Sequence, residues 1–365
     1  MGMDPGYFGI ANDFKTDFLA NRARPLYTLL YTTGSEKEQC LHEYPPTAVK
    51  SVISWLQISR QDKIAEQDVV SEEMYQARIK GRSVRHQLRG VDYHVTEWGE
   101  RHSRLVVFLH GWGDAGSTFQ FVIDELKQDW FVIAPDWRGF GESRIDAESY
   151  WFPDYLADLD AILQIYSPDA AVRLVGHSMG ANVATLYAGV MPERVSALVN
   201  VEGFGLANSD PADAPGRYRK WIEAGRSRPT VTSYESFAEL VPRILRRSPG
   251  LGKERALFVA EKWAEAHADG VVRIKADPAH KLPNAVLYRR REAVACWSNV
   301  TAPVLVVVGA DTDFTGHLES WIDPDAVSGM FGKAESVSIA GAGHMVHFDQ
   351  PARLAESIER FLANT

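Results

Sequence analysis

The chain has 365 residues, of which 45% are hydrophobic and 24% charged, as expected for an ordinary soluble globular protein. Its formal net charge of −9 disfavours a general nucleic-acid binder, and its two cysteines, Cys40 and Cys296, cannot form a disulfide framework, which favours a cytoplasmic location. No apolar run approaches the about 20 residues of a membrane span, and no basic segment precedes an apolar core at the N-terminus, so we expect neither a membrane partner nor a secretory signal.

The first part of the chain, residues 1–73, carries no pattern that indicates chemistry. Apolar residues at helical spacing predict one amphipathic helix within residues 47–60. We expect residues 1–73 to be an N-terminal accessory arm, partly helical or containing residues added by cloning. The functional domain is expected to begin near Met74.

From there on, short apolar runs alternate with helical patterns. Strands are predicted at residues 83–88, 91–98, 105–109, 131–134, 172–175, 197–201, 304–308 and 336–339, with helices opening at Pro153, Met179 and Pro351. Continuous apolar runs are typical of strands buried on both faces. The sequence therefore predicts an α/β fold, a mostly parallel sheet with helices on both faces, built from residues 74–203 and 300–365.

Residues 204–299 interrupt this alternation. They contain several helical patterns, scattered prolines and tryptophans, but no clear strand, and we interpret them as a helical insertion. The aromatic residues there favour an apolar or aromatic substrate group, and the arginines could accept a carboxylate. Arginine clusters such as Arg217 and Arg219 are otherwise expected to be solvated faces of helices.

The strongest motif is Gly176-His177-Ser178-Met179-Gly180, which joins a predicted strand to a predicted helix and matches G-x-S-x-G. This sharp turn exposes a serine hydroxyl beside the free N–H groups of a helix N-terminus. Ser178 is therefore the candidate nucleophile.

Further candidate residues follow the predicted strands, where ligands bind in open α/β sheets. His344, in a glycine-rich loop, suits the role of general base. The backbone N–H groups of Trp112 and Met179 are expected to form an oxyanion hole. His344, His347 and Asp349 could alternatively bind a metal, although no further ligand cluster accompanies them.

At this point the chain resembles the α/β-hydrolase superfamily. The resemblance rests on the His110-Gly111 loop, on Asp136-x-Arg138-Gly139-x-Gly141-x-Ser143, on the serine motif, and on Gly343-His344 followed by Gln350-Pro351. A weaker similarity to the serine-hydrolase-like branch comes from the segments around Glu202 and Cys296-Trp297. The resemblance implies an eight-stranded type of sheet, residues 204–299 as a helical cap, and no metal or organic cofactor.

The resemblance also implies contacts with a small-molecule substrate, and we expect the protein to be a monomer or homodimer. The residues expected to contact substrate are His110, Gly111, His177, Phe204 and His347.

The acid of a Ser–acid–His triad has two possible positions. Many family members carry an aspartate three residues after a strand-ending glycine, a position that is Thr312 here, flanked by Asp311 and Asp313. In other branches the acid ends the strand after the nucleophile helix, where Glu202 lies. We favour Glu202, because a carboxylate that ends a buried strand needs a partner, and place Asp311 ahead of Asp313 as the alternative.

These residues predict a serine hydrolase that acts on a carboxylic ester or related acyl compound. The same triad could instead cleave a C–C bond or a lactone, or the protein could be a hydrolase-like ligand binder of low turnover. A serine in place of an aspartate nucleophile argues against epoxide hydrolase and haloalkane dehalogenase chemistry.

Overall fold

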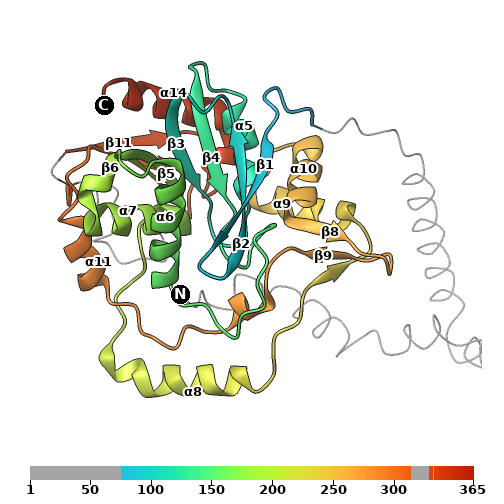
Figure 1. Ribbon diagram of the computed structural model, residues 1–365. Helices are drawn as coiled ribbons and strands as arrows, with labels where there is room; N and C mark the ends of the chain where they lie inside the picture. The colour runs from blue at the N-terminus through green and yellow to red at the C-terminus, as the bar shows by residue number, and fades with distance from the viewer. Residues whose placement is uncertain (1–74, 314–328, 332) are drawn as a thin grey trace, which may run out of the picture. The chain divides into compact units, whose positions relative to one another are not determined.

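The computed structural model describes residues 75–313, 329–331 and 333–365 (Figure 1). The predicted helix at residues 47–60 and the predicted accessory arm lie outside these ranges.

Eight strands form one sheet in the order β1-β2-β4-β3-β5-β6-β10-β11. Their bounds are β1 (Arg82–Leu88), β2 (Val91–Trp98), β3 (Arg104–Leu109), β4 (Trp130–Pro135), β5 (Val172–His177), β6 (Val195–Val201), β10 (Val304–Gly309) and β11 (Ala334–Ile339). Strand β2 runs antiparallel to both of its neighbours, and the remaining neighbours pair in parallel. Every strand predicted for the sheet is present, with ends shifted by at most two residues.

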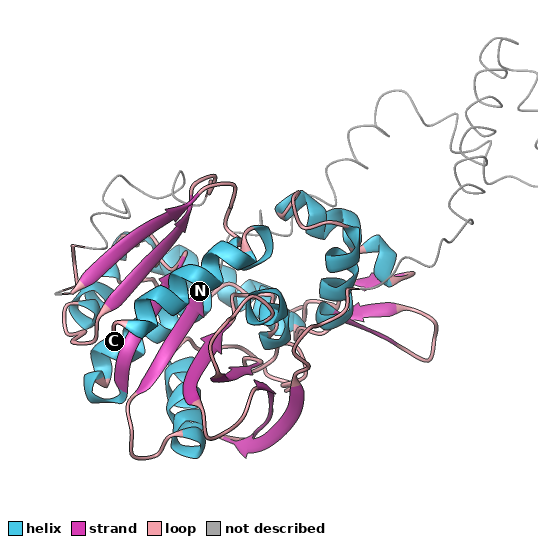
Figure 2. Cartoon of the chain, turned by 90° about the horizontal axis from the view of Figure 1, so that it is seen from above, coloured by secondary structure: helices cyan, strands magenta, loops and turns pink. Residues whose placement is uncertain are grey.

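Alternate residues of the central strands enter two separate cores, one on each face of the sheet. On β3, Val107 and Leu109 pack in one core and Val106 and Phe108 in the other, as the period of two in a strand requires. The first core is covered by α6 (Pro153–Tyr166), α7 (Met179–Val190) and α11 (Arg290–Trp297), and the second by α5 (Gln120–Ile123) and α14 (Pro351–Ala363). Figure 2 shows helices on both sides of the strands.

The segment between β6 and β10 contains both helices and strands. The helices are α8 (Ala214–Gly225), α9 (Val241–Arg247) and α10 (Lys253–Trp263), followed by α11 next to the sheet. A small sheet has the order β7-β9-β8, formed by β7 (Ser233–Tyr234), β8 (Ala264–Ala266) and β9 (Val272–Ile274). The prediction that this segment has no strand is therefore wrong, because strands of two or three residues are too short to show an alternating pattern.

The helices between β6 and β10 differ in how they are packed. Side chains of α9 and α10 form a third core with Phe121 of α5 and with Phe348 of α13 (Val346–Asp349). Helix α8 has no buried residue and projects away from the other elements at the bottom of Figure 1. Short 3-10 turns complete the described chain at Gly116–Phe119, Pro192–Arg194, Pro211–Asp213, Phe237–Glu239 and Pro278–Lys281. Within the described ranges, no helix has both the length and the apolar character needed to cross a bilayer.

Candidate active site

Ser178 lies on a strained turn between β5 and α7. Its φ of 51° and ψ of −114° fall in a region that non-glycine residues rarely adopt. The backbone N–H of Ser178 holds the turn in place by donating to Val201 O at 2.8 Å. The turn also depends on Gly180, where an added Cβ would lie 2.1 Å from the backbone oxygen of Leu109. Such strain is typical of functional sites.

His344 lies between Ser178 and Glu202. Its Nε2 is 3.1 Å from Ser178 Oγ, and its Nδ1 is 3.0 Å from Glu202 Oε2. The backbone oxygen of His344 accepts a hydrogen bond of 2.8 Å from His177 Nε2. Burial lowers the pKa of His177 well below its usual value, so this side chain stays neutral while it holds the His344 loop in place.

The Glu202 carboxylate is buried and receives hydrogen bonds from several segments. Besides the contact of Oε2 with His344, Oε1 accepts from Gly309 N at 2.7 Å and Oε2 from Thr312 Oγ1 at 2.8 Å. Glu202 itself has a φ of 58°, which turns the chain sharply at the end of β6. These partners offset the cost of burying a carboxylate.

The alternative acids lie elsewhere. Asp311 and Asp313 are exposed to solvent, on either side of Thr312. Thr312 occupies the position at which many family members carry an aspartate, and here its hydroxyl donates to Glu202. The structure thus brings Glu202, rather than either aspartate, to the imidazole of His344.

A cavity of about 230 Å³ is lined by both Trp112 and Met179, the residue that follows Ser178 in the chain. Met179 is the first residue of α7, so its N–H is among those without an acceptor inside the helix. The other lining residues are mostly aromatic or apolar; they are Ser149, Tyr150, Trp151, Phe152, Tyr155, Trp221, Ala279, His280, Leu282, Pro283, Asn284, Ala285 and Val286. The cavity therefore suits a largely apolar ligand.

His280 is a cavity residue that the sequence analysis missed. Its ring stacks between Phe140 and Tyr150, with ring centroids 3.8 and 3.5 Å away. Burial lowers the pKa of His280 to about 3, so the imidazole is neutral at physiological pH. A lone histidine inside an insertion without a motif offers no sequence signal for this position.

Four side chains that the sequence analysis expected to contact substrate are instead buried in the protein: His110, His177, Phe204 and His347. None of the four is among the residues that line the described cavity. His110 shows the reason, because its Nδ1 donates to Gly111 O at 2.7 Å and its Nε2 accepts from Trp137 N at 2.8 Å. Gly111 packs against His177, whose Nδ1 would lie 3.0 Å from an added Cβ. In the described structure these residues support the walls of the site, and their contact with substrate stays a prediction.

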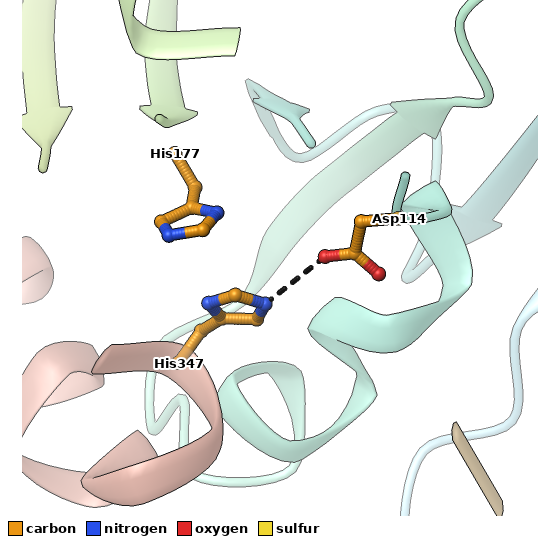
Figure 3. Close-up of side chains that lie close together, drawn as sticks. All are labelled: Asp114, His177 and His347. Carbon is orange, nitrogen blue, oxygen red and sulfur yellow. Dashed lines mark hydrogen bonds and ion pairs between the residues drawn. The ribbon is translucent and has the colours of Figure 1, made fainter. Parts of the chain in front are cut away.

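Asp114 connects three segments near the site. Its Oδ2 is 3.2 Å from His347 Nε2, as Figure 3 shows, and its Oδ1 accepts from Trp263 Nε1 at 2.7 Å and from Thr118 Oγ1 at 2.8 Å. Burial alone would raise the pKa of Asp114, but the hydrogen bond and charge of His347 lower it overall. The carboxylate is therefore ionised at neutral pH.

The potential metal ligands form a different group from the one the sequence suggested. In the described part of the chain, Asp114, His177 and His347 place one ligand atom each within 4.8 Å of one another. His344 instead contacts Ser178, and Asp349 accepts a hydrogen bond from Gly343 N at 2.9 Å. Within this group His347 contacts Asp114, whose carboxylate also accepts from Trp263 and Thr118, whereas His177 donates to the backbone oxygen of His344.

The motif at residues 136–143 has a supporting role in this geometry. Asp136 is buried, accepts from Gly116 N at 2.7 Å, and contacts His94 Nδ1 at 2.9 Å. Gly141 has a φ of 54°, and an added Cβ would lie 2.3 Å from Asp136 Oδ2. The motif thus secures the loop that begins with His110.

Comparisons with known proteins agree with this fold. The family model described as "alpha/beta hydrolase fold" matches residues 104–351. A serine hydrolase-like protein of Danio rerio is 29% identical over 277 residues, which cover 73% of this chain and 83% of that protein. A thioesterase domain from the curacin biosynthetic pathway superposes with a TM-score of 0.68 at 24% identity, over 77% of this chain and 99% of that one. An esterase of Mycobacterium tuberculosis gives a TM-score of 0.59 at 21% identity, over 78% and 92%. With the family model spanning more than half of its length, the chain belongs to the α/β-hydrolase fold family.

Proposed function

We propose that this protein is a serine hydrolase that cleaves a carboxylic ester or a related acyl compound through an acyl-enzyme on Ser178. The observation that carries the proposal is the continuous contact from Ser178 Oγ to His344 Nε2, at 3.1 Å, and from His344 Nδ1 to Glu202 Oε2, at 3.0 Å. The names of similar proteins, which include serine hydrolase-like proteins and an esterase, support the same reaction class.

Each residue has a role in this proposal. Ser178 Oγ attacks the carbonyl carbon while His344 Nε2 takes the hydroxyl proton, and Glu202 keeps the Nδ1 proton of His344 directed away from the serine. The N–H groups of Trp112 and Met179 stabilise the oxyanion. His344 then returns the proton to the leaving alkoxide, and water hydrolyses the acyl-enzyme by the same steps.

The cavity supports an apolar acyl or alcohol group as the bulk of the substrate. Aromatic residues, among them Tyr150, Phe152 and Trp221, line it together with Trp112 and Met179, the expected oxyanion-hole residues. Cys296 is a free thiol among the described residues, which supports the proposal that the enzyme works in a reducing cytoplasm.

Labelling with a fluorophosphonate probe tests the proposal, because only an activated serine displaces fluoride from the phosphorus. We expect the wild-type chain to gain one adduct on the peptide that contains Ser178. Ser178→Ala should abolish the adduct, His344→Ala should slow its formation strongly, and Asp311→Asn should leave it unchanged as the matched control. Wild-type protein that is folded but unlabelled would contradict the proposal. If the wild type is labelled, a panel of esters, lactones and thioesters would define its substrate.

A further inference from the structure

Helix α8 combines basic and exposed apolar side chains. Its residues Tyr218, Trp221 and Ile222 are spaced i, i+3 and i+4, so they share one face, and 52%, 38% and 52% of their surfaces are exposed. Arg217 lies on one flank of this face, and Arg219 lies on the other. No residue of the helix is buried, so packing against the core does not explain its apolar face.

The apolar face of α8 continues into the mouth of the cavity. Trp221 lines the cavity, as do Trp151 and Val286, whose surfaces are 59% and 54% exposed. We call Trp151, Tyr218, Trp221, Ile222 and Val286 the rim patch. Large apolar side chains gathered in this way on a surface usually mark an interaction site.

The charge of this region differs from that of the whole chain. Residues 214–228 contain Arg217, Arg219, Lys220, Arg226 and Arg228, against Glu223 as the one acid, although the chain as a whole has a net charge of −9. Arg228 contacts Asp146, and the others lie along the helix or just after it. Asp210 and Asp213 precede the helix and Asp146 pairs with Arg228, so the attraction of a negatively charged molecule would come from the basic residues of α8 itself.

From this arrangement we propose that α8 and the rim patch bind the surface of an anionic lipid bilayer. A helix with aromatic and aliphatic residues on one face and arginines on both flanks lies in the interface of a membrane, with the apolar face in the lipid and the guanidinium groups at the phosphates. Such a helix lies on the bilayer and needs no membrane span. The proposal departs from the expectation, made from the sequence, that Arg217 and Arg219 are merely solvated and that no membrane is a partner.

Two other occupants fit the same residues less well. A second copy of the chain, paired about a two-fold axis, would bring the basic residues of α8 against an identical basic surface. A nucleic acid would explain the arginines, but Ile222 and Val286 offer it neither a stacking surface nor a hydrogen bond. An anionic bilayer uses both the charge and the aliphatic side chains.

Flotation of the full-length chain with lipid vesicles tests the proposal. We expect the protein to float with vesicles of phosphatidylcholine mixed with phosphatidylglycerol, to stay unbound with phosphatidylcholine alone, and to be released by high salt. Replacing Arg217 and Arg219 together by glutamine should weaken binding by about 25-fold, because each basic residue near such a surface strengthens binding by about fivefold.

The apolar contribution is tested by Ile222→Asp, which should abolish flotation. Val190→Asp is the matched control: Val190 is also apolar and 55% exposed, at the end of α7 and outside the rim patch, and its substitution should leave flotation unchanged. Thermal unfolding of both variants checks that they are folded.

Several results would overturn the proposal. These are the absence of binding to the anionic vesicles, equal binding to neutral vesicles, or equal effects of the two aspartate substitutions. Light scattering after size exclusion adds another: a wild-type dimer that becomes a monomer with Ile222→Asp would identify a second copy as the occupant of the rim patch.

Discussion

At the scale of single residues, Glu202 is the carboxylate that the structure places on His344 Nδ1. The change Glu202→Gln keeps the shape of the side chain but removes its charge and leaves the imidazole without its orienting acceptor. If Glu202 is the acid of the triad, steady-state kinetics with an ester substrate should show kcat lowered by about 10⁴-fold, as for loss of a triad carboxylate elsewhere. Asp311→Asn should change kcat by less than about twofold, because that side chain is exposed. A large effect of Asp311→Asn with a small one of Glu202→Gln would reverse the assignment.

Thr312 permits a sharper test of the contact between Glu202 and His344. Its hydroxyl lies 2.8 Å from Glu202 Oε2, so a carboxylate at this position would lie near the imidazole. In the Glu202→Gln background, adding Thr312→Asp should therefore restore part of the lost kcat, about tenfold or more, by supplying a negative charge from the neighbouring loop. Thr312→Asn in the same background is the control for shape and should restore nothing. Equal activity of the two double variants would show that the position cannot serve His344.

At the scale of elements, the hydrogen bond from Trp263 to Asp114 joins α10 to the loop after β3. Trp263→Phe keeps most of the aromatic surface but leaves the buried carboxylate with one donor fewer. Because hydrogen bonds to charged groups are the stronger ones, we expect the free energy of unfolding to fall by about 1.5–3 kcal/mol in chemical denaturation. A change of less than about 0.5 kcal/mol would show that Asp114 does not depend on α10.

The lowered pKa of Asp114 predicts that the stability of the folded protein depends on pH. The pKa of Asp114 is lower in the folded protein than in an unfolded chain, so its contribution is fully present above the unfolded pKa of about 4. The contribution is lost as the pH falls from that value toward the folded pKa. Thermal unfolding should therefore show a smaller loss of stability between neutral and acidic pH for Asp114→Asn than for the wild type. Parallel curves for the two proteins would contradict this expectation.

At the scale of the whole molecule, local stability should follow the division between the packed sheet and α8. Helix α7 packs in the first core through Val183, Ala184 and Tyr187, whereas α8 has no buried residue. Because opening α8 exposes little apolar surface, its amides should exchange with deuterium on the order of a thousandfold faster than those of α7, measured by mass spectrometry of peptides. Equal protection of both helices would show that α8 is covered by another surface in solution.

The sequence by itself determined the features that depend on local pattern. Strands buried on both faces appear as apolar runs, so the strands of the main sheet were predicted with ends shifted by at most two residues, and α6, α7 and α14 open where predicted. Helix α5 was not predicted. The turn at Ser178 was predictable because its glycine spacing and its flanking strand and helix lie within one short segment. The strands between β6 and β10 were not predictable, because a pair or triplet of residues carries no periodic signal.

Only the tertiary structure decided which side chains meet across the chain. Glu202 and His344 are 142 residues apart, and Asp114 and His347 are 233 apart, so neither contact leaves a local trace in the sequence. The sequence left Glu202 and Asp311 as alternatives because both follow strands at the same edge of the sheet. The two acids differ in where their side chains lie. Glu202 sits at a sharp backbone turn with its carboxylate buried beside His344, whereas Asp311 is exposed to solvent.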